Sequence, residues 1–176
     1  MELISADQWR EQMRASREVL KVELRDHYGA DTELFAAWEA NDLNAVEASY
    51  QGWAETFRAK YVEAGRAFRR VRVVSEPLSR YQAMAVAYSG ITVDMGEGLR
   101  WLPRRFTSTL ALPGNDFFVL DSQGAIFTVL DADGAEIVEV QRTTTEDELE
   151  FCKGAFTGAW DLAVPHHEYR AWTIST

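Results

Sequence analysis

Arginine side chains are concentrated in one stretch of the sequence. Residues 66–106 carry eight arginines, no lysine and three acidic groups. The flanking segments are acidic, with seven basic against thirteen acidic groups in residues 1–65 and three against twelve in residues 107–176. Guanidinium groups bind carboxylates and phosphates through paired, directional hydrogen bonds. The stretch therefore predicts a site for an anionic or phosphate-bearing ligand; the alternative is that its arginines pair with the acidic flanks across the fold.

Candidate ligand-binding residues follow from where two predicted strands end. Residues 69–74 and 99–102 predict strands with a helix between them, which implies a parallel pair joined by a right-handed crossover. Ligands favour the crevice beyond the carboxyl ends of such strands, where the first amides of a helix starting at Pro77 would also lie. The candidate ligand-binding residues are Arg72, Ser75, Glu76, Arg100, Arg104 and Asp121. The alternative is an internal Glu76–Arg104 ion pair with capping by Ser75.

Catalytic chemistry has weaker candidates in this sequence. Glu76 or His167 would serve as a general base, with arginines stabilising a phosphoryl group. His167 follows a predicted helix end, however, where histidine commonly contacts the last carbonyls. Gly96 and Gly98 lack the third glycine of a dinucleotide loop, and the Walker, nucleophile-elbow and His-Glu-x-x-His motifs are absent. We therefore expect no cofactor and assign no catalytic residue.

Histidine and cysteine are too sparse to predict a metal site. The chain has three histidines, without the paired spacing of zinc ligands, and one cysteine. Cys152, whose neighbours fit a helix, is predicted to be an inert core thiol. We expect no metal and no disulfide within the chain.

The first 65 residues predict a helical lobe. Ser5 and Gln8 form a capping box for an amphipathic helix that runs to about residue 26. A short helix over residues 31–39 and a long helix over residues 42–64 follow it. The apolar faces of the two long helices predict a helical hairpin that covers a sheet; the alternative is that one face meets a partner protein.

Residues 66–176 predict a mixed sheet. Arg70 and Arg72 alternate with valines, as in a strand with one face on the core. A closing helix begins at a Thr145–Glu148 capping box and ends before Pro165. The intervening segments 117–120, 125–130 and 135–140 predict an antiparallel meander.

These elements together predict an α+β fold. It consists of an N-terminal helical hairpin packed on a mixed sheet, which combines a parallel βαβ pair with an antiparallel meander, and a closing C-terminal helix. At 176 residues and 47% hydrophobic content, the chain suffices for one sizeable core. We therefore expect a single domain over residues 1–176.

Four stretches carry distinctive motifs. They include Val73-Val74-Ser75-Glu76-Pro77-Leu78, Leu99-Arg100-Trp101-Leu102-Pro103-Arg104, Leu112-Pro113-Gly114 and Pro165-His166-x-Glu168-Tyr169. These motifs resemble a family of small actinobacterial proteins of unknown function, over nearly the whole chain. The resemblance implies a regulatory or conflict-system accessory role, with a helix-turn-helix regulator or a BldB-like small protein as partner, because the family is often encoded beside such genes.

The latter half of the chain is also similar to phospholipase-D-like sensor domains, through the strand-rich region that follows Arg100-Trp101-Leu102-Pro103. It lacks the His-x-Lys-x-x-x-x-Asp motif of active members, since no histidine has a lysine two places later. This second resemblance therefore implies a catalytically silent version of such a domain.

Charge and hydropathy limit the partners. The net charge of −10 argues against direct nucleic-acid binding. No apolar run reaches the roughly 18 residues of a membrane span, and the first residues lack the layout of a signal peptide, so we expect a cytoplasmic protein without membrane contact. We predict a non-enzymatic regulatory or accessory module that binds a protein partner or a small anionic ligand at an arginine-rich sheet edge. The alternatives are a hydrolase or transferase acting on a phosphate-bearing substrate, the silent sensor domain, and a purely structural subunit.

Overall fold

Eight strands form one mixed sheet in the computed structural model, which describes residues 1–173. The strands are β1 (Glu2–Leu3), β2 (Glu18–Glu23), β3 (Ala67–Val74), β4 (Gly98–Pro103), β5 (Asp116–Leu120), β6 (Gly124–Leu130), β7 (Ile137–Thr143) and β8 (Val164–Pro165). Their order across the sheet is β1-β7-β6-β5-β2-β3-β4-β8. The central strands β2, β3 and β4 are parallel, and the other neighbouring pairs are antiparallel.

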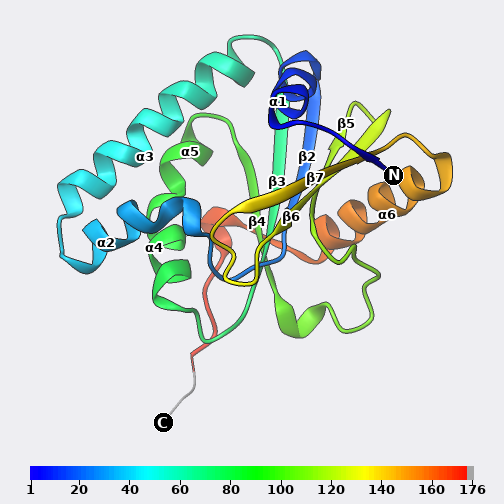
Figure 1. The fold of residues 1–176 in the computed structure, drawn as a ribbon. Coiled ribbons are helices and arrows are strands. Elements are labelled where there is room, and N and C mark those ends of the chain that lie inside the picture. Colours follow the sequence, from blue (N-terminus) through cyan, green and yellow to red (C-terminus); the bar gives the residue numbers. More distant parts are fainter. Residues whose placement is uncertain (174–176) are drawn as a thin grey trace.

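Six α-helices cover the two faces of this sheet (Figure 1). They are α1 (Ala6–Ala15), α2 (Thr32–Glu39), α3 (Leu43–Phe57), α4 (Arg80–Tyr88), α5 (Gly90–Asp94) and α6 (Glu146–Leu162), and a π-helical turn, Arg58–Val62, extends α3. Helix α6 packs along one face. Helix α1 and the group α2–α5 cover separate parts of the opposite face.

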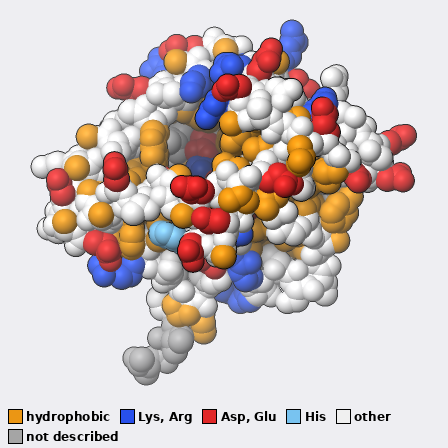
Figure 2. Space-filling model, in the orientation of Figure 1, with side chains coloured by type: hydrophobic (Ala, Val, Ile, Leu, Met, Phe, Trp, Pro, Cys, Tyr) orange, Lys and Arg blue, Asp and Glu red, His pale blue; other side chains and the backbone are white. Residues whose placement is uncertain are grey.

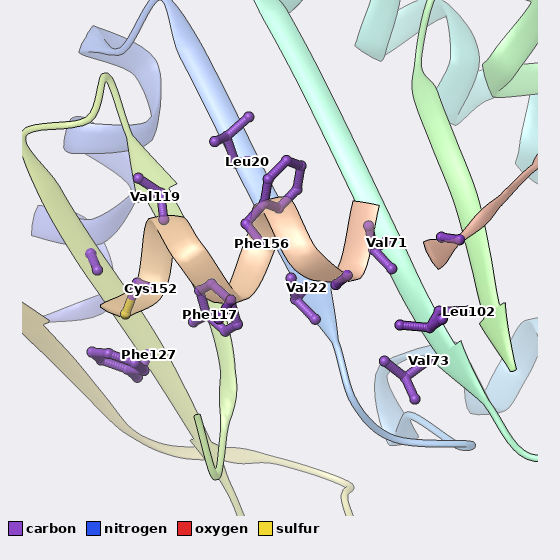
Figure 3. Packing of buried hydrophobic residues seen from close by; sticks show 14 of the residues in the cluster. Leu20, Val22, Val71, Val73, Leu102, Phe117, Val119, Phe127, Cys152 and Phe156 are labelled. Atoms are coloured by element: carbon purple, nitrogen blue, oxygen red, sulfur yellow. The ribbon is translucent and has the colours of Figure 1, made fainter. Parts of the chain in front are cut away.

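Side-chain alternation along the central strands gives α6 an apolar surface to pack on. Leu20 and Val22 of β2 and Val71 of β3 point toward α6, where Figure 3 shows them around Phe156. Cys152 of α6 lies in the same core, and its burial raises the pKa of the thiol to about 11, so the predicted core thiol is confirmed. Burial of each large apolar side chain contributes roughly 1.5–3 kcal/mol to stability. This core is therefore the main interaction that holds α6 on the sheet.

The first helix is shorter than the sequence predicts. Its capping box is confirmed, since the Ser5 amide donates to Gln8 Oε1 at 2.7 Å and the Gln8 amide donates to Ser5 Oγ at 3.2 Å. The helix ends at Ala15, however, and residues 18–23 form β2 in the middle of the sheet. The six residues Glu-Val-Leu-Lys-Val-Glu fit a helix turn or a strand equally well, and pairing with both β3 and β5 decides for the strand.

The predicted fold class is confirmed in its main features. The structure is α+β, with parallel β3 and β4, the antiparallel meander β5–β6–β7 and the C-terminal helix α6. Helices α2 and α3 pack together through a shared apolar cluster with α4. Because β2 lies within residues 1–65, the segment predicted as a helical lobe also supplies a central strand.

One predicted helix start is wrong, and one is confirmed without its predicted capping box. The helix after β3 begins at Arg80, where Ser79 Oγ accepts from the Gln82 amide at 3.1 Å, and not at Pro77. Thr145 is the N-cap of α6, as predicted, but its side chain accepts no hydrogen bond there. Instead, Thr143 Oγ1 accepts from the Thr145 amide at 3.0 Å, so the preceding strand supplies the side-chain oxygen at this turn.

Replacement of Phe156 by alanine tests the α6 core. Phe156 is buried, so Phe156→Ala should lower the free energy of unfolding by about 3–5 kcal/mol in urea denaturation. Phe151→Ala is the matched control on the same helix, because Phe151 is 46% exposed and its loss should change stability by no more than about 0.5 kcal/mol. Equal effects of the two changes would contradict this packing.

Candidate functional site

A cavity of about 590 Å³ lies on the face of the sheet opposite α6. It is bounded by side chains of β2, β3, β5 and β6 and by α1, α3 and α4, where α1 and the α2–α5 group leave the sheet uncovered. Figure 2 shows the hollow, with basic and acidic side chains inside it. Its volume falls within the range of small-molecule binding sites, roughly 300–1,000 Å³.

The floor of the cavity is charged because of the same alternation that makes the α6 side apolar. Lys21 and Glu23 of β2, and Arg70 and Arg72 of β3, all line the cavity. The register pairs Lys21 with Arg70 and Glu23 with Arg72 on adjacent strands. Four charged side chains are thus held next to one another by the strand pairing itself.

Glu23 is the centre of a buried ion network. Its Oε1 accepts from Lys21 Nζ at 2.6 Å and from Arg70 Nη1 at 3.2 Å, and its Oε2 lies 2.8 Å from Arg72 Nε. Arg70 Nε also lies 2.7 Å from Glu97 Oε1, and Glu97 is buried. Three cations therefore share two buried carboxylates. Burial alone would raise the pKa of Glu23, but Lys21, Arg72 and Arg70 together hold that pKa well below its usual value.

Aromatic rings surround the buried Arg72 guanidinium. Its Cζ lies 5.4 Å from the Trp101 ring centroid, 5.8 Å from that of Tyr81 and 6.0 Å from that of Tyr28, all within the range of cation–π attraction. Burial raises the pKa of both tyrosines, and nearby carboxylates raise it further. Both side chains are therefore neutral phenols that donate hydrogen bonds.

The two tyrosine hydroxyls fix two carboxylates at the cavity. Tyr28 donates to Asp116 Oδ2 at 2.5 Å, and Tyr81 donates to Asp31 Oδ2. Asp116 also accepts from the Leu24 amide at 2.8 Å. Burial raises the pKa of Asp116, and the hydrogen bond from Tyr28 opposes that shift.

Two backbone segments close one side of the cavity. The Gly29 amide donates to the Gly134 carbonyl at 2.9 Å, which joins the segment after β2 to the turn between β6 and β7. A Cβ atom at Gly29 would overlap the backbone of Ala135, so only glycine allows this approach. Gly134 has a φ of +70°, a conformation that glycine adopts without strain.

Three of the six predicted ligand-binding residues lie together at the carboxyl edge of the parallel strands. Ser75, Glu76 and Arg104 line a second cavity, of about 380 Å³, with Arg105 and Trp172. Their polar groups already bond within the protein. Arg104 donates to Ser75 Oγ at 3.0 Å and to the Leu24 carbonyl at 2.6 Å.

Glu76 is also held by internal contacts. It accepts from the Tyr169 hydroxyl at 2.8 Å and from the Trp172 amide at 3.0 Å, and it pairs with Arg105. The predicted internal pairing of Glu76 therefore occurs with Arg105, whereas Arg104 pairs with Asp26 at 3.3 Å. These contacts fasten the C-terminal segment and the loop after β2 to the sheet edge.

The prediction that all six residues gather at one edge is wrong. Arg72 lies in the cavity on the sheet face, and Arg100 points to the opposite face, where it donates to the Trp160 carbonyl at 2.9 Å. The register pairs Arg72 with Trp101, so Arg100, one residue earlier, has the other orientation. Asp121 lies at the opposite edge, because β5 runs antiparallel to β2, and it accepts from the Glu18 amide at 2.7 Å.

The two candidate bases, Glu76 and His167, contact different residues. His167 Nε2 lies 3.1 Å from Asp94 Oδ1, and both side chains are exposed. His166 Nδ1 accepts from Trp101 Nε1 at 2.9 Å, and burial lowers the pKa of His166. Within residues 1–173, no group of three His, Cys, Asp or Glu side chains is arranged to hold a metal ion.

Sequence reasoning missed the residues that complete the cavity. The predicted first helix, which runs to about residue 26, includes Lys21 and Glu23, and the predicted site residues do not include Tyr28 or Tyr81. The signal in the sequence is confined to β3, where Arg70 and Arg72 alternate with valines, because the pattern of residues 18–23 fits a helix as well as a strand. Charges at every second position of strands in the middle of a sheet indicate a polar site beneath the covering layer.

The fold and this cavity define a class: α+β proteins with one mixed sheet, closed on one face by an apolar core and carrying a ligand-sized cavity with a charged floor on the other. The chain belongs to the family described as Domain of unknown function (DUF6879), which matches residues 7–171. A search of curated proteins found no match. In the described part of the chain, no helix has both the length and the apolar character needed to cross a membrane.

Removal of the Glu23 carboxylate tests the ion network. Glu23→Gln leaves the buried Arg72 and the partly buried Lys21 and Arg70 with one carboxylate, that of Glu97, and should lower the free energy of unfolding by about 3–5 kcal/mol in urea denaturation. The control is Glu18→Gln on the same strand, whose partly exposed pair with Arg69 should be worth no more than about 1 kcal/mol. A Glu23 effect as small as that of the control would show that the network does not stabilise the fold.

The low pKa of Glu23 predicts how this difference depends on pH. The network stabilises the carboxylate, so its contribution is complete above the ordinary pKa of about 4.5 and is lost as pH falls toward the lowered value. The gap in unfolding free energy between wild type and Glu23→Gln should stay constant from pH 7 to pH 5.5 and narrow below pH 4.5, measured by urea denaturation at each pH. A gap that widens on acidification would contradict the assignment.

Proposed function

We propose that the protein is a non-catalytic regulatory or accessory module that binds a small molecule with an anionic group in the 590 Å³ cavity. The observation that carries this proposal is the buried Arg72, which is only 5% exposed. Its Nε lies 2.8 Å from Glu23 Oε2 without an aligned hydrogen bond, and its Nη2 donates to Tyr81 at a long 3.4 Å. Within residues 1–173, the buried Nε of Arg72 therefore has no hydrogen-bond partner.

A guanidinium has five N–H donors, and burial makes each one that lacks an acceptor costly. The ion pairs themselves join three cations, Lys21, Arg70 and Arg72, to two carboxylates, Glu23 and Glu97. A carboxylate or phosphate of a bound ligand would accept from Arg72, whose Nε lacks a partner. Tyr50 and Trp53 of α3 and Phe118 of β5 offer apolar surface for the rest of such a ligand.

The cavity supports this function better than the sheet edge does. At the edge, Arg104 and Arg105 are already paired with Asp26 and Glu76. The alternative of a hydrolase or transferase rests on Glu76 and His167, and the contacts of neither residue favour it. A helix-turn-helix or BldB-like partner, an actinobacterial origin and a cytoplasmic location stay predictions.

A thermal-shift panel tests the proposed function. The probes are indole-3-propionate, 3-phenylpropionate, adenosine monophosphate and inorganic phosphate, at millimolar concentration with the full chain. A probe that binds the folded state alone stabilises it by about 2.7 kcal/mol at 100 times its Kd, so at least one organic anion should raise the Tm by several degrees.

A cavity-filling variant locates the response. Ala30 lines the cavity, so Ala30→Trp should abolish the Tm shift, whereas Ala36→Trp, on the exposed surface of α2 and outside the cavity, should keep it. Absence of any shift, or a shift that survives Ala30→Trp, would contradict the proposal. A response lost only in Arg104→Ala would move the site to the sheet edge.

A further inference from the structure

The charges around the cavity are separated along the strand direction. Lys21 and Arg70 come first on β2 and β3, and Glu23 and Arg72 follow two residues later, or about 7 Å further along. The segment after β2 and the turn after β6 lie beyond the carboxyl ends of these strands and carry Asp31 and Glu136, which also line the cavity. The cavity is therefore cationic toward one end and acidic toward the other.

The acidic end is not neutralised by the protein. Neither Asp31 nor Glu136 forms an ion pair within residues 1–173. Arg25, on the same side, donates to the backbone carbonyl of Asp131 at 3.5 Å and not to a carboxylate. Figure 2 shows acidic side chains near the hollow on this face. A ligand with an anionic group alone would face repulsion there, because like charges in a partly desolvated site are unfavourable.

One hydroxyl lies between the two kinds of charge. Tyr81 Oη accepts from Arg72 Nη2 at 3.4 Å and donates to Asp31 Oδ2. A guanidinium and a carboxylate are thus held on either side of a single oxygen atom. A ligand that contacts both needs an anionic and a cationic group only a few ångströms apart, as on the α-carbon of an amino acid.

We infer that the ligand is an α-amino acid with a large apolar or aromatic side chain, which refines the proposed function and rests on it. Its carboxylate accepts from Arg72, and its ammonium group donates to Asp31. The side chain extends toward Tyr50, Trp53 and Phe118, which line the same cavity.

The test compares three ligands that share one ring system. L-tryptophan carries both charged groups, indole-3-propionate lacks the ammonium group, and tryptamine lacks the carboxylate. Isothermal titration calorimetry with the wild-type full chain should give a Kd for L-tryptophan at least tenfold lower than that for either analogue. The measurement is repeated with the L-phenylalanine, 3-phenylpropionate and 2-phenylethylamine series, in order to separate the role of the charges from that of ring size.

A variant assigns the ammonium contact. Asp31→Asn should raise the Kd of L-tryptophan at least tenfold and leave that of indole-3-propionate within twofold of wild type. The matched control is Asp133→Asn, because Asp133 lies in the turn after β6 but does not line the cavity. If Asp31→Asn does not fold, the comparison of three ligands on the wild type still decides the inference.

The outcomes separate this inference from the proposed function. If indole-3-propionate binds as tightly as L-tryptophan, or if only the anionic analogues bind, the amino-acid inference is overturned and the anion-binding function stands. If tryptamine binds as tightly as L-tryptophan, both are overturned, because the carboxylate then contributes nothing. If neither series binds at all, the amino-acid inference is overturned, and the Ala30→Trp comparison with the other anions decides the proposed function.

Discussion

The carboxylate of Glu23 and the three cations around it are the constraint on which this architecture depends. Each of these charges is costly to bury alone, and together they are tolerable because two oxygens contact Lys21, Arg70 and Arg72 at once. A helix with an apolar face cannot pack directly over such a cluster. The covering layer therefore divides into α1 on one side and α2–α5 on the other, and the space between them is the cavity.

Strands β2 and β3 present different kinds of side chain on their two faces. Toward α6 they present Leu20, Val22 and Val71, and the helix closes over them completely. Toward the cavity they present charged residues at the intervening positions. This division gives the fold an apolar core that does not rely on an occupied cavity, while the charged face is held by ion pairs and by the hydroxyls of Tyr28 and Tyr81.

The sequence predicts the part of this structure in which local pattern and packing agree. The Arg/Val alternation of β3 fits a strand alone, and the apolar stripe of α6 fits a helix alone. These two elements and the strands of the meander form as expected. The prediction of a helix at Glu18–Glu23 is wrong for a physical reason. These six residues fit the repeat of a helix and that of a strand, and pairing with β3 and β5 makes them a strand. No local signal reveals that pairing.

The candidate site is less predictable than the fold for a related reason. Arg72 is identified from its place in the arginine-rich stretch, but its companions come from positions 23, 28 and 81 and meet only in the folded chain. Arg100 pairs with Val71 and not with Arg72 in the strand register, so its side chain lies on the opposite face of the sheet.

The hydrogen bond from the Gly29 amide to the Gly134 carbonyl joins two segments at one boundary of the cavity through main-chain atoms alone. Because this link joins main-chain atoms, the spacing of the two segments does not change with side-chain rotamers. It instead follows the bending of the β6–β7 hairpin relative to the segment after β2. Substitutions in the interior of the cavity can therefore alter what fits there without altering this boundary.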